Sequence, residues 1–396
     1  MSLEALFERR SLGIRLGLEA VTRAWEQLGA PCRGVPAVHV VGTNGKGSTS
    51  AMVDHALRRW GRRVGLYTSP HLHRVGERVR VDGVAESDDA LQAAVDRVLA
   101  LEQDPTSLPR PLSFFEVLTL AAWLRFAERG VDVIVAEAGM GGRWDATRIC
   151  DARVVAIASI ALDHQAFLGD TLAAIAGEKV AVARPGVPVF SVAQAPEVLA
   201  VLRAETTAIG APLTIVPPLP RAPVGLLGEH QRDNGALALA AAAAIDPRVV
   251  AGDLDGVAWP GRFERIAAGA GHVILDVGHN PAGIAALLVT LGREAPTAVV
   301  AVGCVADKDA ASIAAAMRAW GGTWAWVDLT DFGASGTAPD APTQLDGPAP
   351  LFAWIDAALD DGGTVCVCGS HVLVAAVRAR ILGLAPAEPG ERTTVP

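Results

Sequence analysis

The stretch 38-VHVVGTNGKGSTSAMVDHALRRW-60 decides the fold of this chain. It runs from a Val-rich segment of strand length, through a glycine-rich turn, into apolar residues at helical spacing. Such a turn is the setting of a phosphate-binding loop, because backbone N–H groups and the helix N-terminus face the anion. The spacing departs from the strict Walker pattern: two residues separate Gly42 from Gly45, and Gly47 stands where that pattern has Ser or Thr. Strand, turn and helix together still predict phosphate binding, with Lys46 supplying positive charge.

Lysine is rare in this chain: of 34 Lys and Arg residues, only Lys46, Lys179 and Lys308 are Lys. A lysine amine is a compact point charge suited to a phosphate, and it can lose its proton and react; a guanidinium does neither well. The retained lysines therefore indicate chemistry. We expect 177-GEK-179 to open a helical or loop segment that ends near residues 185–186. A solvated Glu–Lys pair is the alternative interpretation.

The composition narrows the class of protein. A length of 396 residues suggests two or three domains, and 51% apolar residues suffice for sizeable cores. The net charge of −9 and the lack of a basic face argue against a nucleic-acid partner. Five scattered cysteines without a C-x-x-C pair favour a reducing compartment. The N-terminus lacks the apolar core of a signal peptide, and the apolar run at 236–245 is too short for a membrane span. We expect a soluble, cytoplasmic protein.

Apolar runs of strand length alternate with helical stretches along the chain. In the first part, strands are expected at 38–41, 64–68, 131–136 and 154–160, and helices at 48–60, 90–101 and 115–128. In the second part, strands are expected at 272–277, 297–302, 323–329 and 364–368, and helices at 282–291 and 310–320. This alternation is typical of parallel sheets buried on both faces. We predict an α/β protein with a P-loop-type, mostly parallel sheet domain over 1–255 and a smaller Rossmann-like α/β domain over 256–396. Residues 331–350 are expected to form a surface loop.

Polar motifs follow the strands of the first series. They are 68-TSPH-71, 137-EAGMGGR-143 and 162-LDH-164. Because loops at the C-terminal ends of parallel strands line the ligand crevice, we expect these motifs beside the phosphate loop. A carboxylate there, Glu137, is a natural Mg²⁺ ligand, and His164 is plausible beside it with a serine hydroxyl. The glycines after Glu137 allow close approach of the backbone.

The second series carries one comparable motif, 276-DVGHNP-281, between an apolar strand and a helix. Asn280 is expected to cap that helix. At the junction of the two domains, Arg262 is positioned to close on a nucleotide.

The ordered set of motifs resembles the folylpolyglutamate synthase/dihydrofolate synthase family, the folate branch of the Mur ligase superfamily. The resemblance runs from about Leu16 to Asp309. The motifs that carry it lie at 42–48, 69–72, 113–116, 137–147, 162–172, 178–179, 260–263 and 276–281.

The resemblance implies an ATP-dependent amide ligase with a Mur ligase-like first domain, using ATP and Mg²⁺. ATP would phosphorylate the carboxylate of dihydropteroate or a folate, and the amine of L-glutamate would attack the acyl phosphate. The residues that this resemblance implies for nucleotide binding are Asn44, Gly45, Lys46, Gly47, Ser48, Asn234, Arg262 and Asp276. The nucleotide would then lie between the two domains. The implied Mg²⁺ ligands are Ser69, Glu137 and His164, and the implied catalytic residues are Lys46, Lys179 and His279. Lys179 matches a lysine that is carbamylated in the family. The implied acceptor contacts are Arg15, Leu16, Gly17, Leu18, Ser113, Phe114, Phe115, Trp144, Asp145 and Ala146. We expect a monomer with small-molecule substrates and no nucleic-acid or membrane partner.

Two positions near the implied pterin site depart from the family pattern. Trp144 stands where Leu is usual, and Arg148 where Asn is usual. A Mur-type ligase acting on a non-folate carboxylate is therefore an alternative. A nucleotide-binding protein without ligase activity is a second one, which the joint presence of a metal-binding set and Lys179 disfavours. Dihydropteroate and tetrahydrofolate both remain open as acceptors.

Overall fold

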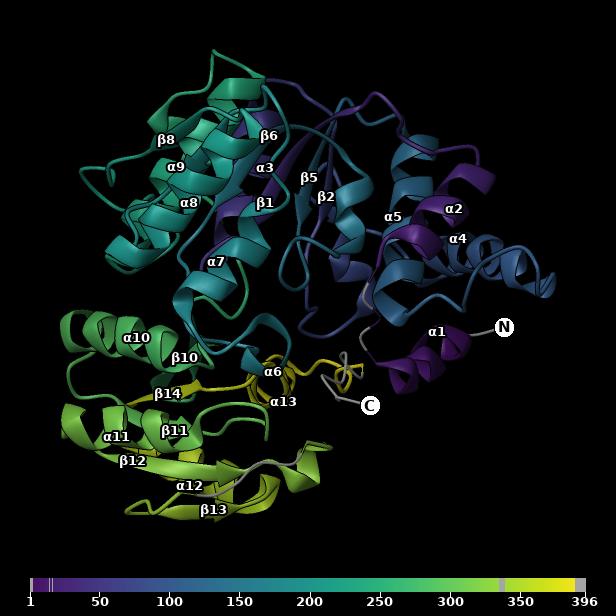
Figure 1. Ribbon diagram of the computed structural model, residues 1–396. Coiled ribbons are helices and arrows are strands. Elements are labelled where there is room, and N and C mark those ends of the chain that lie inside the picture. The colour runs from purple at the N-terminus through teal and green to yellow at the C-terminus, as the bar shows by residue number, and fades with distance from the viewer. Residues whose placement is uncertain (1–2, 14, 16, 335–338, 389–396) are drawn as a thin grey trace. The chain divides into compact units, whose positions relative to one another are not determined.

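The computed structural model describes residues 3–13, 15, 17–334 and 339–388, and it consists of two α/β units (Figure 1). Among the described residues, the first unit takes in 3–220 and 233–257, and the second takes in 221–232 and 258–388. The short segment 221–232 therefore belongs with the second unit, which the sequence does not indicate. The domain division at 255/256 stays a prediction.

The first unit contains an eight-stranded sheet in the order β4-β3-β2-β5-β1-β6-β7-β8. Its strands are β1 (Pro36–Val41), β2 (Val64–Tyr67), β3 (Val79–Val81), β4 (Val84–Ala85), β5 (Val133–Glu137), β6 (Asp151–Ile157), β7 (Val189–Ser191) and β8 (Leu213–Ile215). All neighbouring pairs from β2 to β8 are parallel, and β3 and β4 are antiparallel additions at one edge. The predicted mostly parallel sheet is thus confirmed.

The helices of the first unit surround this sheet. They are α1 (Glu4–Glu8), α2 (Glu19–Gln27), α3 (Lys46–Arg59), α4 (Asp88–Ala100), α5 (Phe114–Arg129), α6 (Gln165–Leu168), α7 (Leu172–Val180), α8 (Pro196–Ile209) and α9 (His230–Ile245), the last beginning in the second unit. Short 3₁₀ turns lie at η1 (Arg9–Leu12), η2 (Val75–Arg78), η3 (Leu101–Gln103), η4 (Ala146–Ile149) and η5 (Ala251–Leu254). Helix α5 begins at a reciprocal capping box of Ser113 and Glu116, the arrangement that satisfies two exposed N–H groups at a helix start.

The core of the first unit lies where α2, α4 and α5 pack on the β2–β5 side of the sheet (Figure 1). Its centre is aromatic: the Tyr67 ring lies 5.7 Å from that of Trp123, which lies 5.8 Å from that of Phe126. A second core holds α7 and α8 against β6 and β7. These buried side chains keep the strand ends, and the loops that follow them, in a fixed arrangement.

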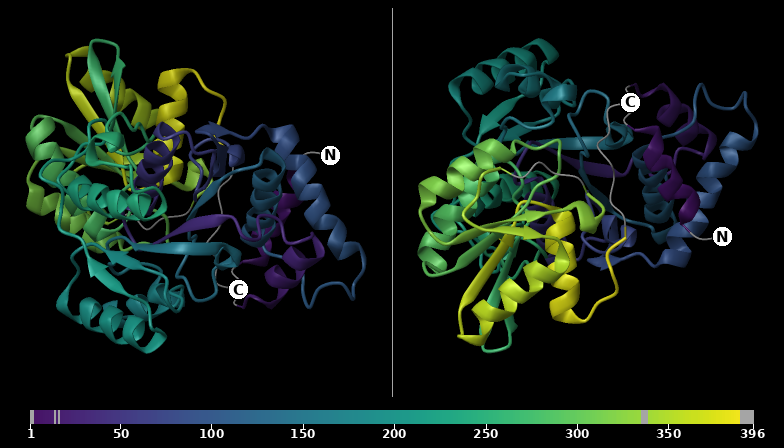
Figure 2. Two further views of the ribbon diagram at one scale, coloured as in Figure 1. Left: turned by 90° about the horizontal axis from the view of Figure 1, so that it is seen from above. Right: turned by 90° about the horizontal axis from the view of Figure 1, so that it is seen from below.

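The second unit contains a six-stranded sheet in the order β13-β12-β11-β14-β10-β9. Its strands are β9 (Glu264–Ala268), β10 (Gly271–Asp276), β11 (Val299–Val302), β12 (Trp324–Asp328), β13 (Gln344–Asp346) and β14 (Thr364–Cys368), and all pairs are parallel except β9 with β10. Its helices are α10 (Pro281–Glu294), α11 (Ala310–Trp320), α12 (Pro348–Asp360) and α13 (His371–Leu382), with a 3₁₀ turn η6 (Thr330–Phe332). α10 and α11 cover one face of the sheet, and α12 and α13 contact β14 and β10 from the other (Figures 1 and 2).

The predicted surface loop at 331–350 is wrong in its second half. β13 lies within it, and α12 already begins at Pro348. The strand is only three residues long and has one buried side chain, Leu345, so it shows no apolar run. It exists because it pairs with β12, which a local pattern cannot reveal.

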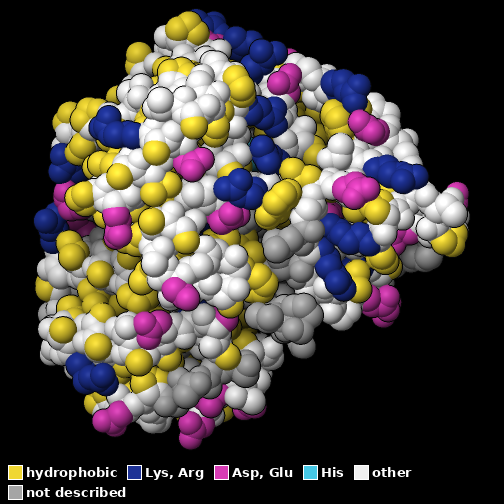
Figure 3. All heavy atoms as spheres, in the orientation of Figure 1, with side chains coloured by type: hydrophobic (Ala, Val, Ile, Leu, Met, Phe, Trp, Pro, Cys, Tyr) yellow, Lys and Arg dark blue, Asp and Glu magenta, His cyan; other side chains and the backbone are white. Residues whose placement is uncertain are grey.

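Within the described parts of the chain, every helix is too short or too polar to cross a membrane. On the face in Figure 3, basic and acidic side chains are intermixed rather than segregated. Among the described residues, opposite charges also pair directly, such as Arg380 with Asp356 at 2.6 Å.

Candidate active site

Four neighbouring parallel strands carry the sequence motifs. The order β2-β5-β1-β6 places the ends of these strands side by side at one edge of the sheet. The loops 68–71, 138–143, 42–48 and 158–164 follow these strands in that spatial order. Motifs that are more than a hundred residues apart in sequence, such as 42–48 and 158–164, are therefore adjacent in space.

The phosphate loop is fastened to the loop after β6. The backbone N–H groups of Thr43 and Asn44 donate to the carbonyl of Ser159 at 2.7 and 3.1 Å, and the Thr43 hydroxyl contacts Ala161. Gly42 has a φ of 147°, and a Cβ there would lie 2.8 Å from the Ala158 Cβ. Glycine is therefore needed for the loop to lie this close to its neighbour.

Helix α3 starts directly from this loop. Gly45 precedes it with a φ of 89° and provides no side-chain cap, so the first N–H groups of α3 are not capped by the residue at its N-cap position. The positive end of a helix with exposed N–H groups is an anion site. The Lys46 amine donates to the Thr43 carbonyl at 3.1 Å, beside those groups. A Cβ on Gly45 would lie 2.2 Å from Oδ1 of Asn234, so this residue of α9 packs directly against the phosphate loop.

Lys179 lies at the end of α7, and its side chain reaches the phosphate loop. The residue is 4% exposed, and its amine donates to the Gly42 carbonyl at 2.7 Å. Burial, reinforced by the nearby charge of Lys46, lowers the pKa of this amine to about 7. The amine is therefore ready to lose its proton near neutral pH, a state that Arg cannot reach.

Both expectations for 177–179 are wrong. These residues form the last turn of α7 instead of opening a segment, because Thr171 caps the helix six residues earlier by accepting from Ala174 N. They are also not a solvated Glu–Lys pair: Lys179 is buried, and Glu178 pairs with Arg143 at 2.8 Å.

The glycine-rich loop after β5 wraps onto the end of α7. A Cβ on Gly142 would lie 2.8 Å from the Lys179 carbonyl oxygen, and Arg143 N donates to the Glu178 carbonyl at 2.9 Å. A Cβ on Gly139 would lie 2.7 Å from the Phe115 ring. The close backbone approach predicted for these glycines is confirmed, and it places the loop between α7 and the start of α5.

Glu137 is the last residue of β5 and is 3% exposed. Its Oε2 accepts from Ser69 N at 3.1 Å, so two of the three expected metal ligands are neighbours. His164 has a φ of 52° at the start of α6, and its N–H donates to Asp163 Oδ1 at 2.9 Å. Within residues 3–13, 15, 17–334 and 339–388, no group of three or more His, Cys, Asp or Glu side chains is arranged to hold a metal.

Asp145 organises its own loop from a buried position. Its Oδ1 accepts from the Thr147 N–H at 2.9 Å and from the Thr147 hydroxyl, and its Oδ2 accepts from Met140 N at 3.1 Å. Burial raises the pKa of this carboxyl. Ala146 is buried directly after it, whereas Trp144 is 46% exposed.

His39 is a buried residue of this network that the sequence analysis misses. It lies in β1, and its Nε2 contacts the Thr147 hydroxyl at 2.9 Å. Burial and the charges of Arg184 and Arg148 lower its pKa to about 3, so the ring is neutral. The available signal is a histidine inside an otherwise Val-rich strand. Arg148 itself donates to the Arg143 carbonyl at 3.0 Å.

The acceptor residues expected near α5 differ in exposure. Ser113 caps the helix, and Phe115 is half-buried, with its ring 5.7 Å from that of Tyr67. Phe114 is 3% exposed, and its ring packs against that of Phe7 and beneath the Arg78 guanidinium, so its side chain is not placed for ligand contact.

The acceptor residues expected near α2 lie in the segment that leads into that helix. Arg15 is exposed, Gly17 is half-buried, and Leu18 precedes α2. Leu16 lies outside the described residues.

In the second unit, the end of β10 holds the expected motif. Asp276 accepts from Phe263 N at 3.0 Å and from Gly278 N at 2.8 Å, so its carboxylate shapes the turn that carries Arg262. Asn280 caps α10 through Gly283 N at 2.9 Å, as predicted.

His279 lies between Asp276 and this helix cap. Its Nδ1 contacts the Val277 carbonyl at 2.9 Å. A carbonyl only accepts, so Nδ1 is the donor and Nε2 is the acceptor in the neutral ring. The ring of His371, the first residue of α13 after neighbouring β14, lies 5.5 Å from the His279 ring, and no sequence motif marks this second histidine.

Comparisons with known proteins agree with the motif order. Residues 261–371 match the family model described as Mur ligase, glutamate ligase domain. The chain is 33% identical over 338 residues to the dihydrofolate synthase/folylpolyglutamate synthase of Bacillus subtilis, covering 76% of this chain and 78% of that protein. It is 36% identical over 336 residues to the probable bifunctional folylpolyglutamate synthase/dihydropteroate synthase of Haloferax volcanii, covering 77% of this chain but only 40% of that protein.

Solved structures resemble the whole chain. Mycobacterium tuberculosis folylpolyglutamate synthase complexed with ADP is similar with a TM-score of 0.82 and 31% identity, covering 97% of this chain and 99% of that one. A folylpolyglutamate synthase complex with AMPPCP and folate is similar with a TM-score of 0.82 and 29% identity, covering 97% and 100%.

Proposed function

Because the chain belongs to the folylpolyglutamate synthase/dihydrofolate synthase family of ATP-dependent ligases, we propose that it joins L-glutamate to the carboxylate of a pteroate or folate acceptor. The observation that carries this proposal is the buried Lys179 amine, bonded to the phosphate loop at 2.7 Å with its pKa lowered to about 7. A protein that only binds a nucleotide has no need for a deprotonatable amine at that position.

The chemistry proceeds through an acyl phosphate. A carboxylate oxygen of the acceptor attacks the γ-phosphorus of ATP, and ADP leaves. The amine of L-glutamate then attacks the acyl carbon, inorganic phosphate leaves, and the amine loses a proton as the amide forms. In the first step negative charge develops on the transferring oxygens. Lys46 and the N–H groups at the start of α3 would stabilise this charge, which is the main task in phosphoryl transfer.

The residues at the strand ends fit a Mg²⁺ ion. Mg²⁺ in nucleotide sites is commonly held by one or two carboxylates, with waters and substrate phosphates completing its shell, so one carboxylate without a three-group cluster suffices. Glu137, a Ser69 hydroxyl and His164 would hold it. When bound, the ion neutralises phosphate charge as a Lewis acid. Glu137 is buried at the strand end and hydrogen-bonded to Ser69 N, which keeps it oriented.

The remaining site residues have proposed roles. We assign nucleotide contacts to the phosphate loop, to Asn234 and to Arg262, with Asp276 acting by shaping the turn before Phe263. His279 would act near the transferring phosphate. The acceptor would contact the segments 15–18 and 113–115 and the loop 144–146. We also propose a cytoplasmic location and a monomeric state.

One observation favours a second candidate function. Trp144 is 46% exposed within the loop 144–146, and Arg148 donates to the carbonyl of Arg143, the residue that precedes this loop. A bulky ring and an added positive charge would suit a different acceptor. The alternative is a ligase of the same type that acts on a non-folate carboxylate.

Release of inorganic phosphate from ATP, measured with L-glutamate and each acceptor in turn, tests both functions. We expect release that requires glutamate and either dihydropteroate or tetrahydrofolate, with the glutamylated product identified by mass spectrometry. If neither dihydropteroate nor tetrahydrofolate supports phosphate release, the folate assignment is contradicted and the alternative is favoured.

A further inference from the structure

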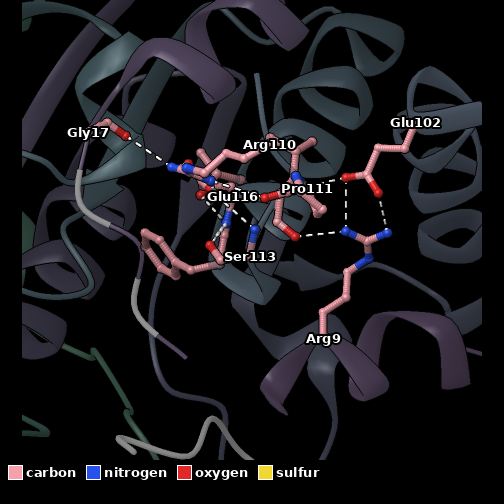
Figure 4. Close-up of polar contacts among 10 residues, drawn as sticks. Arg9, Gly17, Glu102, Arg110, Pro111, Ser113 and Glu116 are labelled. Atoms are coloured by element: carbon pink, nitrogen blue, oxygen red, sulfur yellow. Dashed lines mark hydrogen bonds and ion pairs between the residues drawn. The ribbon is translucent and has the colours of Figure 1, made fainter. Parts of the chain in front are cut away.

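Two arginine–glutamate pairs hold the stretch that leads into α5 (Figure 4). This stretch, residues 110–113, ends at the Ser113 cap, directly before the two phenylalanines proposed to meet the acceptor. Of these four residues, only Glu116 lies in a motif that carries the family resemblance, at 113–116. Each pair holds the backbone of a segment beside the proposed acceptor site.

The first pair, Arg9 with Glu102, fixes Leu112. Two guanidinium nitrogens of Arg9 bind the two carboxylate oxygens of Glu102 at 2.9 and 2.5 Å. Arg9 also donates to the Leu112 carbonyl at 2.7 Å, and Glu102 accepts from Leu112 N at 2.8 Å. Both backbone polar groups of one residue are therefore held by a single ion pair.

The second pair, Arg110 with Glu116, contacts the backbone of two separate segments, at Ser113 and at Gly17. Its two nitrogen–oxygen distances are both 2.9 Å, and Glu116 at the same time accepts from Ser113 N at 2.8 Å. The terminal nitrogen of Arg110 that binds Oε1 also donates to the carbonyl of Gly17 at 3.3 Å (Figure 4). The helix cap is thus connected, through one guanidinium, to the segment that precedes α2.

The start of α5 is close to the loops of the candidate site. The Phe115 ring lies against Gly139, two residues after Glu137. The Phe114 ring lies 6.1 Å from that of Phe7, so the same helix start contacts α1 as well. A shift of this helix start relative to the segment at Gly17 would change the space between two groups of proposed acceptor contacts.

We propose that Arg110 is a positioning residue for the acceptor: it holds Gly17 to the cap of α5 and so sets the spacing between Gly17 and the segment 113–115. The proposal rests on the proposed ligase function. The planar fork of arginine is needed, because one nitrogen must serve Glu116 and Gly17 together while the other completes the bidentate pair. A lysine at the same position keeps the charge but lacks the fork. It can pair with Glu116 without holding Gly17.

Arg110→Lys therefore tests the tie, and Arg125→Lys is the matched control. Arg125 lies in α5, as Glu116 does, and binds Glu86 through two nitrogens at 3.1 and 2.9 Å, with side chains of similar burial, but it is near the C-terminal end of that helix, away from the Ser113 cap. We expect the Arg110 variant to raise the KM for the acceptor about tenfold, the scale of losing a hydrogen bond from a charged group. We expect the KM for ATP, kcat and Tm to match those of the control.

Gly17→Ala provides a second variant that leaves Arg110 intact. Gly17 has a φ of 110° with no protein atom within 4 Å of an added Cβ, so within the protein the substitution acts only by disfavouring this backbone conformation. Gly29→Ala is its control, with a φ of 84° and equally open space. We expect only the Gly17 variant to raise the KM for the acceptor.

Amide hydrogen exchange of the peptide that covers residues 13–18 gives a readout independent of turnover. We expect faster exchange there in Arg110→Lys than in the wild type or in Arg125→Lys.

If the wild type is active but both the acceptor KM and this exchange are unchanged in Arg110→Lys, the positioning role is overturned and the ligase function stands. If exchange is faster with an unchanged acceptor KM, the tie is only structural and the proposal is again overturned. If the wild type turns over no acceptor, the proposed function fails, and the positioning role fails with it.

Discussion

At the scale of single residues, the amine of Lys179 combines two properties that a surface lysine lacks. It is buried, and it donates to the carbonyl of Gly42 in the phosphate loop. Both burial and the neighbouring Lys46 favour its neutral form. A neutral amine is a nucleophile, a property that arginine lacks and that would favour lysine at this position in an arginine-rich chain.

The first prediction is that Lys179→Arg is inactive. If the neutral amine attacks CO₂, it forms a carbamate and releases one proton, so a neutral group becomes an anion. Arginine stays protonated and cannot follow this path. We expect turnover to fall by at least about 100-fold, the scale seen when a group that stabilises developing charge is removed. Partial rescue of Lys179→Ala by acetate would support the carbamate, whereas substantial activity in Lys179→Arg would exclude it.

The second prediction concerns stability and pH. The pKa of the Lys179 amine is about 7 in the folded chain against an ordinary 10.5. Between these values the unfolded chain binds more protons, so the free energy of unfolding rises with pH. The cost of burying this amine is therefore complete below about pH 7 and disappears as the pH approaches 10.5. Lys179→Met removes the titrating group. Its gain in unfolding free energy over the wild type should be largest near neutral pH and shrink towards pH 10, as measured by urea denaturation. A difference that does not vary with pH would contradict the lowered pKa.

At the scale of elements, the contact between α3 and α9 depends on one glycine. Gly45 ends the phosphate loop with a φ of 89°, and any Cβ would overlap the Asn234 amide at 2.2 Å. The buried Asn234 side chain of α9 therefore occupies the space that a side chain at position 45 would need. The spacing of glycines in the sequence indicates the turn, but the neighbour that excludes a side chain comes from a helix almost two hundred residues later.

The third prediction is that Gly45→Ala weakens ATP binding. Alanine must either shift the loop or displace Asn234, and it adopts this φ at a cost of about 1 kcal/mol. We expect the KM for ATP to rise at least about tenfold, since the N–H groups at the helix start lose their alignment towards phosphate. Gly61→Ala is the control, because Gly61 follows the same helix with a φ of 76° and nothing within 4 Å of an added Cβ. Equal ATP kinetics in the two variants would show that the Asn234 contact has no effect on the nucleotide.

At the scale of the whole molecule, the proposed reaction would draw on groups from both units. Lys46, Glu137 and Lys179 belong to the first unit, and Arg262 and His279 belong to the second. An acyl phosphate hydrolyses in water, so a ligase of this type must shield it from solvent. Groups from both units are therefore expected to influence the same turnover.

The fourth prediction tests this expectation through Arg262. Arg262→Ala should raise the KM for ATP and lower kcat, because a cation near the nucleotide is lost. Arg265→Ala is the control, since Arg265 is an exposed residue of β9 in the same unit. Steady-state rates at varied ATP concentration measure both effects. Unchanged ATP kinetics in Arg262→Ala would mean that the nucleotide contacts lie in the first unit only.

The sequence alone determined the class of fold and the motifs of the site. Buried parallel strands read as apolar runs, and glycine-rich turns after them read as phosphate and metal loops, because both signals are local to a few residues. The Asn280 cap was predictable for the same reason. The tertiary structure decided the rest. The burial of Lys179, the neutral state of His39, the strand at β13 and the reach of Arg110 to Gly17 each depend on a partner distant in sequence. Local patterns carry no information about such partners, because the desolvation, pairing and hydrogen bonds that define these residues exist only once the chain has folded.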